Sequence, residues 1–258
     1  MNQPTTEFRP LSGLQVEPAI LDGIAKAELD TMAAAGDAIT DCQQALAAAG
    51  SNVIAELLKD SSDFFEWDHY PPGDVYDWNS HAQYYYHAHP PENRRDLVAE
   101  EHGHFHTFLR QRGMPAGVAP MPRADLQVPA DPDDTLTHFV AISMDRSGQP
   151  IRLFTTNRWV TGETWFAADD VIAMLPRFRV DRKSRSDEVN AWITAMLCLF
   201  RPDVARLLQR RDETIAARAA NRPGIDIYED RSLEVLSYMD ISVADRVAAI
   251  ARARNADG

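Results

Sequence analysis

The feature that most constrains this fold is a strict alternation of side-chain types in two short segments, 81–89 and 101–109. Every second residue there is histidine, glutamine or aromatic, and tyrosine, phenylalanine and threonine are frequent. Successive side chains of a strand point to opposite faces, so a period of two predicts strands. A helix over 94–112 is the alternative, because its first half is rich in helix formers. We predict strands, and one face of the second carries His102, His104, His106 and Phe108.

A second pair of strands follows at 137–145 and 150–160, joined by a turn at 146–149. Apolar residues recur at helical intervals both before and after these four strands. We therefore expect an α+β fold, with N-terminal helices, a central antiparallel sheet of about four strands, and C-terminal helices. We expect a single domain over 1–258, with a helical layer at 17–60, a sheet with the histidine-rich strands at 80–160, and a helical layer at 165–255.

Several segments are rich in turn-forming or acidic residues and lack the apolar periodicity of a helix or a strand. The acidic and aromatic stretch 63–80, with Pro71–Gly73 inside it, predicts an ordered loop with a turn. The proline-rich stretch 113–136 predicts a long connection. We expect Gly36 and Gly50 to divide the first helical layer into about three pieces. A solvated helix start is indicated by Asp226, Glu229, Asp230 and Glu234.

The charge balance and the absence of targeting patterns narrow the range of partners. The formal net charge of −13 repels nucleic acid and anionic membrane surfaces. The sequence has no run of 18 apolar residues and no positive region followed by an apolar run at its start. Cys42 and Cys198 lie among apolar neighbours, as reduced thiols do. We therefore expect a soluble, cytoplasmic protein without nucleic-acid or membrane partners, and its oligomeric state stays open.

Histidine is concentrated in one part of the chain. Seven of the eight histidines fall between His69 and His106, where an even spread would place about one. Neutral imidazole is the commonest protein ligand for zinc and iron, and residues at i and i+2 of a strand point the same way. Two neighbouring strands of this kind could bring three or four ring nitrogens to one ion. We therefore predict a divalent metal, zinc or iron, in an enzyme that acts on a small molecule.

The predicted site combines these histidines with two catalytic candidates. Glu101 is the nearest carboxylate and is expected to be a ligand or a general base. Tyr85 shares a face with the histidines of its strand and could orient a ligand or donate a proton. The alternation does not fix the register between the strands, so it does not say which histidines converge. The predicted ligand pool is His87, His89, His102, His104 and His106.

Other interpretations of the histidines remain open. They could form a metal-free network with the tyrosines, in a binding or structural domain without catalysis. The stretch 102–108, HGHFHTF, resembles the signature of the histidine triad superfamily, in which three histidines alternate along a strand. That resemblance implies hydrolysis or transfer of nucleoside monophosphates with His104 as the nucleophile. Gly103 and Thr107 stand where the signature has apolar residues.

A second resemblance covers more of the chain. The combination of YYYHAH, EHGHFHTF and TTNRWVTGETW resembles an uncharacterised bacterial domain family. It implies a fold of its own and no established activity. The last of these segments, 155–163, is dense in hydrogen-bond donors and could form a binding rim around Arg158. We favour an edge strand and a turn with solvated hydroxyls for this segment, and we expect His138 to be a packed or exposed single residue and not a ligand.

Overall fold

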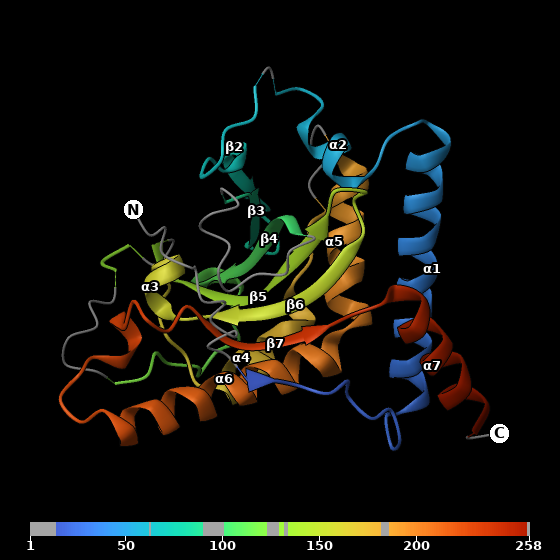
Figure 1. Cartoon of the computed structure of the whole chain (residues 1–258). Helices are drawn as coiled ribbons and strands as arrows, with labels where there is room; N and C mark the ends of the chain where they lie inside the picture. Colours follow the sequence, from blue (N-terminus) through green and yellow to red (C-terminus); the bar gives the residue numbers. More distant parts are fainter. Residues whose placement is uncertain are drawn as a thin grey trace, which may run out of the picture.

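A seven-stranded sheet forms the centre of the computed structural model, which describes residues 14–61, 63–89, 101–122, 129–131, 134–181 and 186–256 (Figure 1). The strand order across the sheet is β1-β7-β6-β5-β4-β3-β2. β1 and β7 run parallel, and the other neighbouring pairs run antiparallel. The α+β class is as predicted, but the sheet has seven strands where the sequence predicted about four.

The four predicted strands lie next to one another within this sheet. They are β3 (Ala82–His87), β4 (Glu101–Arg110), β5 (Leu136–Asp145) and β6 (Pro150–Thr156). β4 confirms the strand predicted at 101–109, where a helix was the alternative. The predicted turn joins β5 to β6. The Asp145 carboxylate stabilises it by accepting hydrogen bonds from the backbone N–H groups of Ser147 and Gln149.

Three strands were missed. β2 (Tyr70–Tyr76) holds the prolines that predicted a loop. It is an edge strand, where a missing N–H breaks no ladder bond, and its register with β3 shifts between Tyr70 and Val75. β7 (Val235–Asp240) lies in the segment assigned to helices, and that assignment is wrong because six residues are too few to separate a buried strand from a helix. β1 (Leu14–Gln15) has two residues.

Helices cover one face of the sheet. α5 (Asp187–Leu199) and α6 (Arg201–Asn221) lie directly on it. The Trp192 ring of α5 is 5.5 Å from that of Phe105 in β4, and the Ser237 hydroxyl of β7 donates to the Leu207 carbonyl of α6. None of the described helices is long and apolar enough to cross a membrane. Besides α5 and α6, the described α-helices are α1 (Lys26–Ala48), α2 (Val53–Leu58), α3 (Arg158–Thr161), α4 (Ala168–Met174) and α7 (Val243–Ala256).

α1 packs against α5 and α7 and is one continuous helix (Figure 1). The predicted break at Gly36 is wrong, because this glycine makes room for a neighbouring helix. A Cβ atom at Gly36 would lie 2.6 Å from the Cγ2 atom of Val247 in α7. Gly50, with φ of 72°, does stand beyond the end of α1, in the left-handed region where glycine is favoured.

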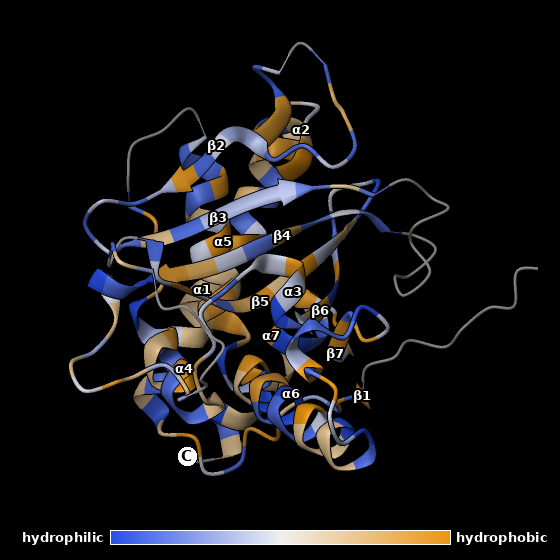
Figure 2. Ribbon diagram, turned by 90° about the vertical axis from the view of Figure 1, so that its left-hand side faces the viewer, coloured by the Kyte–Doolittle hydropathy of each residue, from blue (hydrophilic) through white to orange (hydrophobic). Residues whose placement is uncertain are grey.

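The sheet face turned away from α5 and α6 is polar and aromatic. In Figure 2 β3 is drawn mostly in pale blue and white, the colours of mildly hydrophilic to intermediate hydropathy. All six residues of β3 are nevertheless buried. Buried polar groups need hydrogen-bond partners, so this face is the first place to look for a site.

Candidate metal centre

The register between β3 and β4 places several ring side chains on one face of the sheet. His87 pairs with His104, and Tyr85 pairs with His106. Residues two apart on a strand share a face, so these four side chains point the same way. Phe105, between the two histidines of β4, points instead toward α5. The four side chains therefore lie on the face opposite the helices.

Three of these histidines form a compact buried group. One ring nitrogen from each of His87, His104 and His106 lies within 4.8 Å of the other two. The Nε2 atoms of His87 and His104 are 2.8 Å apart. His106 is fully buried, and its Nε2 atom has no hydrogen-bond partner among the described residues. Leaving a buried polar atom without a partner costs about 1–3 kcal/mol. The group therefore has the spacing and the spare nitrogen of a metal site.

Glu101 reaches the same face through an irregularity at the start of β4. The pairing of β4 with β5 shifts between Glu101 and Gly103, which indicates a β-bulge. The Oε1 atom of Glu101 consequently lies 2.7 Å from Nδ1 of His104, and both side chains are almost fully buried. An ionised carboxylate only accepts hydrogen bonds, so Nδ1 carries the proton and Nε2 presents its lone pair. Glu101 thus orients His104 toward the other two histidines.

The same irregularity removes His102 from the predicted site. The hydroxyl of Tyr86 lies 2.6 Å from Nδ1 of His102, and the Tyr86 ring packs 4.9 Å from Phe105, on the side of the helices. The prediction that His102 shares a face with His104 and His106 is therefore wrong. Strict alternation fails because a bulge inserts one extra residue into the strand.

His138 of β5 joins the cluster. Its Nε2 atom lies 3.0 Å from Nδ1 of His106, and its Nδ1 atom lies 3.4 Å from the hydroxyl of Thr156. His138 is therefore packed, as expected, but it also holds the ring of His106 in place. No sequence signal pointed to this contact, because only the register of β4 against β5 brings the two residues together.

His89 borders the group of three but does not belong to it. Its ring lies 4.7 Å from that of His87 and 5.2 Å from that of His104. On its other side it meets the edge of the Trp67 ring at 4.4 Å. Of the predicted ligand pool, the structure brings together three residues, places His89 beside them and turns His102 away.

Tyr85 stands between two rings next to the histidines. It stacks on His69 at 3.6 Å and on Phe108 at 5.6 Å, and it lies 5.1 Å from His106. The Nδ1 atom of His69 is 3.0 Å from an oxygen of Asp74. Burial, and secondly the charge of Asp74, raises the pKa of the Tyr85 hydroxyl. The hydroxyl therefore keeps its proton at neutral pH and can act as a donor.

Burial keeps the imidazoles of His87, His106 and His138 neutral. Desolvation is the main cause that lowers the pKa of His87 and of His106, and the neighbouring histidines add to it. Desolvation also lowers the pKa of His138, to about 3, with a further effect from the charge of Arg211. A metal ion binds the neutral form of imidazole, so this environment favours the form that a metal requires.

The polar segment at the end of β6 uses its groups within the fold. The side-chain amide of Asn157 donates to the backbone carbonyls of Ile227 and Leu233, and Arg158 forms an ion pair with Glu229. The predicted edge strand with solvated hydroxyls is wrong, because β6 lies between β5 and β7 and the side chains of Thr155, Thr156 and Asn157 are buried. The contacts nevertheless give the segment a structural role within the fold. It lies against the connection between α6 and β7.

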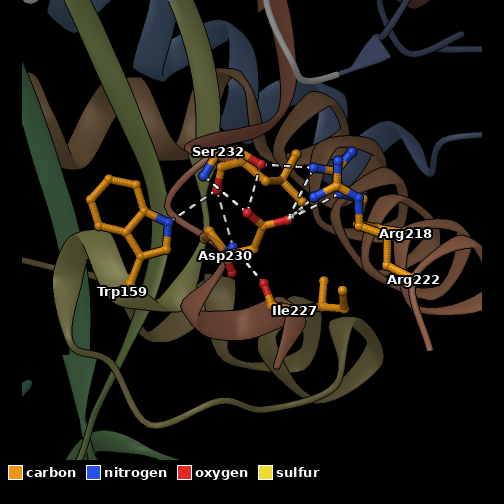
Figure 3. A network of polar contacts seen from close by, with 8 residues as sticks. Trp159, Arg218, Arg222, Ile227, Asp230 and Ser232 are labelled. Atoms are coloured by element: carbon orange, nitrogen blue, oxygen red, sulfur yellow. Dashed lines mark hydrogen bonds and ion pairs between the residues drawn. The ribbon is translucent and has the colours of Figure 1, made fainter. Parts of the chain in front are cut away.

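Asp230 is the centre of the polar network in that connection (Figure 3). Its carboxylate accepts hydrogen bonds from Arg218 at 3.0 Å and from the Ser232 hydroxyl at 2.6 Å, and lies 3.7 Å from Arg222. The indole N–H of Trp159 donates to the backbone of the same connection. A short 3-10 helix, η5 (Ile227–Glu229), begins here, and the Asp226 carboxylate caps it by accepting a hydrogen bond from the backbone N–H of Tyr228. The predicted helix start is therefore present, but the helix is a single turn, and Asp230 and Glu234 follow it.

Comparison with known proteins gives a family and no activity. A family model described as a domain of unknown function (DUF6969) matches residues 33–241. No curated protein and no solved structure matches the chain. The resemblance to an uncharacterised domain family is therefore confirmed, while no comparison connects the chain with the histidine triad superfamily.

Proposed function

The chain belongs to the DUF6969 family, and we propose that it binds one divalent metal ion through His87, His104 and His106. The observation that carries this proposal is the unpartnered, fully buried Nε2 atom of His106 beside the two facing nitrogens of the other histidines. A metal-free network would leave that nitrogen unsatisfied. An ion bound to all three would satisfy it.

The surrounding hydrogen bonds allow one consistent set of tautomers. Glu101 holds the proton of His104 on Nδ1, which leaves Nε2 as a ligand. If His106 binds through Nε2, its Nδ1–H donates to Nε2 of His138. The Nδ1–H of His138 then faces the Thr156 hydroxyl. Carboxylate and hydrogen-bonded neighbours of this kind fix metal-binding imidazoles in many proteins.

The ligand set favours zinc over iron. Three neutral nitrogens with an open fourth position suit catalytic zinc, whereas two histidines and a carboxylate suit non-haem iron. The carboxylate of Glu101 is engaged by His104 and is therefore a positioning group. Zinc–nitrogen bonds of about 2.0–2.1 Å put ligand nitrogens of a tetrahedral ion roughly 3.4 Å apart. The Nε2 atoms of His87 and His104, 2.8 Å apart, need to separate by about 0.6 Å for this.

A metal at this place would support hydrolytic chemistry on a small molecule. Three protein ligands leave a position for water, whose pKa zinc lowers toward neutrality. Tyr85 is a protonated hydroxyl next to His106 and is our candidate for the group that donates a proton. Glu101 has no direct part in that step, and its role is to hold His104.

Elemental analysis of protein purified without a histidine tag tests the proposal. We expect close to one zinc per chain in the wild type and in His102→Ala, and strong loss of metal in His104→Ala. His102 is a matched control, because it lies on the same strand and faces the other side. Absence of any metal after reconstitution, or equal loss in both variants, would overturn the proposal.

A further inference from the structure

A cavity lies between α2 and β2, on the face of the sheet opposite to the histidine group. Its volume is about 460 Å³, within the range of sites for small organic molecules. Leu57 of α2, Val75 of β2 and Tyr84 of β3 line it, and all three are buried. Val75 pairs with Tyr84, whose hydroxyl donates to Asn190 of α5, so this lining faces the helices.

Seven of the fifteen residues that line this cavity are apolar or aromatic. Tyr70, Pro71 and Pro72 of β2 continue it toward the surface. Phe65 lies at its edge with 61% of its surface exposed. The backbone N–H of Phe65 donates to the Tyr70 hydroxyl at 2.6 Å, so the loop that carries the ring is tied to the wall of the cavity. A ligand that covered Phe65 would remove this apolar surface from water.

The charged residues of the lining indicate which kind of ligand the cavity would accept. Five carboxyl groups line the cavity, and the only cation among its described lining residues is Lys59, whose ammonium pairs with Glu56. A negative potential of this kind repels carboxylates and phosphates and attracts cations. Aromatic rings beside carboxylates also favour organic ammonium groups. The carboxyl groups belong to Glu56, Asp60, Asp63, Asp68 and Asp74.

We propose that this cavity binds a small organic cation, an amine with an apolar body. The apolar body would lie on Leu57, Val75 and Tyr84, and the ammonium group would lie at the acidic edge near Phe65. A bare metal ion would contact only the carboxylates and would leave the apolar part of the lining without a contact. The proposal does not depend on the metal centre, which lies on the other face of the sheet.

Binding of tryptamine measured by isothermal titration calorimetry tests this proposal, with the neutral alcohol tryptophol as the matched probe. We expect tryptamine to bind the full-length wild type at least tenfold more tightly than tryptophol. Asp63→Asn combined with Asp68→Asn should weaken tryptamine binding about tenfold and leave tryptophol unchanged. Phe65→Ala should weaken both ligands. Because none of the three proposed metal ligands lines the cavity, His104→Ala should bind tryptamine like the wild type.

A matched control separates the cavity from general attraction to an acidic protein. Asp37→Asn combined with Asp41→Asn removes the same charge from the exposed side of α1 and should leave tryptamine binding unchanged. An equal effect of the two double variants, or equal affinity for tryptamine and tryptophol, would overturn the proposal. Filling the cavity with Ser61→Trp should abolish binding in a protein whose circular dichroism is unchanged. Persistent binding in that folded variant would also overturn it.

Discussion

The Nε2 atoms of His87 and His104 face each other at 2.8 Å on paired positions of β3 and β4. Without a metal, one of these nitrogens must carry a proton toward the other, because two lone pairs would repel. With a metal, both can direct their lone pairs at the ion. The contact is therefore compatible with two protonation states, and metal binding selects one of them.

Removal of the metal should lower the stability of the protein. A ligand that binds only the folded state at a thousandfold its Kd stabilises by about 4 kcal/mol. For a chain of this size that corresponds to a Tm shift on the order of 10 °C. We expect EDTA to lower the Tm of the wild type, measured by calorimetry. His87→Ala should melt at a temperature that EDTA does not change, and an EDTA effect of wild-type size in this variant would contradict the assignment of His87.

Replacement of Glu101 should weaken the site without removing a ligand. Loss of a carboxylate behind a metal-bound histidine typically costs 10–100-fold in metal affinity. We expect Glu101→Leu to show a loss of this size in competition with a fluorescent zinc chelator. Glu101→Gln keeps an oxygen that can accept the proton of His104 and should lose less. An equal loss of zinc affinity in the two variants would show that the hydrogen bond between residue 101 and His104 does not determine the affinity.

The alternation of side chains was enough to predict β3, β4 and the place of the site. It placed His87, His104 and His106 in a pool of five histidines, because residues two apart on a regular strand share a face, but it could not select these three from the pool. It misplaced His102, because a bulge changes the parity of every residue before it. That bulge also brings Glu101 to His104, a contact that strict alternation does not allow.

Long-range pairing was beyond the reach of the pattern. His138 contacts His106 only through the register of two strands, and that register depends on a second shift between His106 and Phe108. β2 was hidden by its prolines, and β7 by its short length. These features depend on the sheet as a whole, and local periodicity does not carry that information.

Gly103 should be required for the bulge that builds the site. A Cβ atom there would lie 2.5 Å from the backbone oxygen of His87 and 2.6 Å from the hydroxyl of Tyr86. We expect Gly103→Ala to lower the free energy of unfolding in urea by about 1–3 kcal/mol, as overpacking does. Combination with Tyr86→Phe removes the contact with the hydroxyl, one of three contacts shorter than 3.0 Å, and should cost less than the sum of the single changes. Strict additivity would contradict this explanation.

Glu163 should make the stability of the protein fall as the pH rises. It is almost completely buried, its Oε2 atom accepts hydrogen bonds from the backbone of His138 and the hydroxyl of Thr137, and burial raises its pKa to about 7. The folded state then holds a proton that the unfolded state, with a pKa near 4.5, has lost. The stability that this proton provides is complete below pH 4.5 and is lost as the pH rises to about 7. The loss amounts to about 3 kcal/mol at most.

Glu163→Gln isolates this effect from that of the buried histidines. The histidines prefer to be neutral in the folded state, so their contribution to stability is lost as the pH falls, which is the opposite trend. The difference in unfolding free energy between the variant and the wild type cancels the histidine contribution. We expect this difference, measured by urea unfolding, to shift in favour of the variant between pH 4.5 and 7 and to stay constant above pH 8. A difference that is flat across that range would mean that the folded protein holds Glu163 in its ionised form.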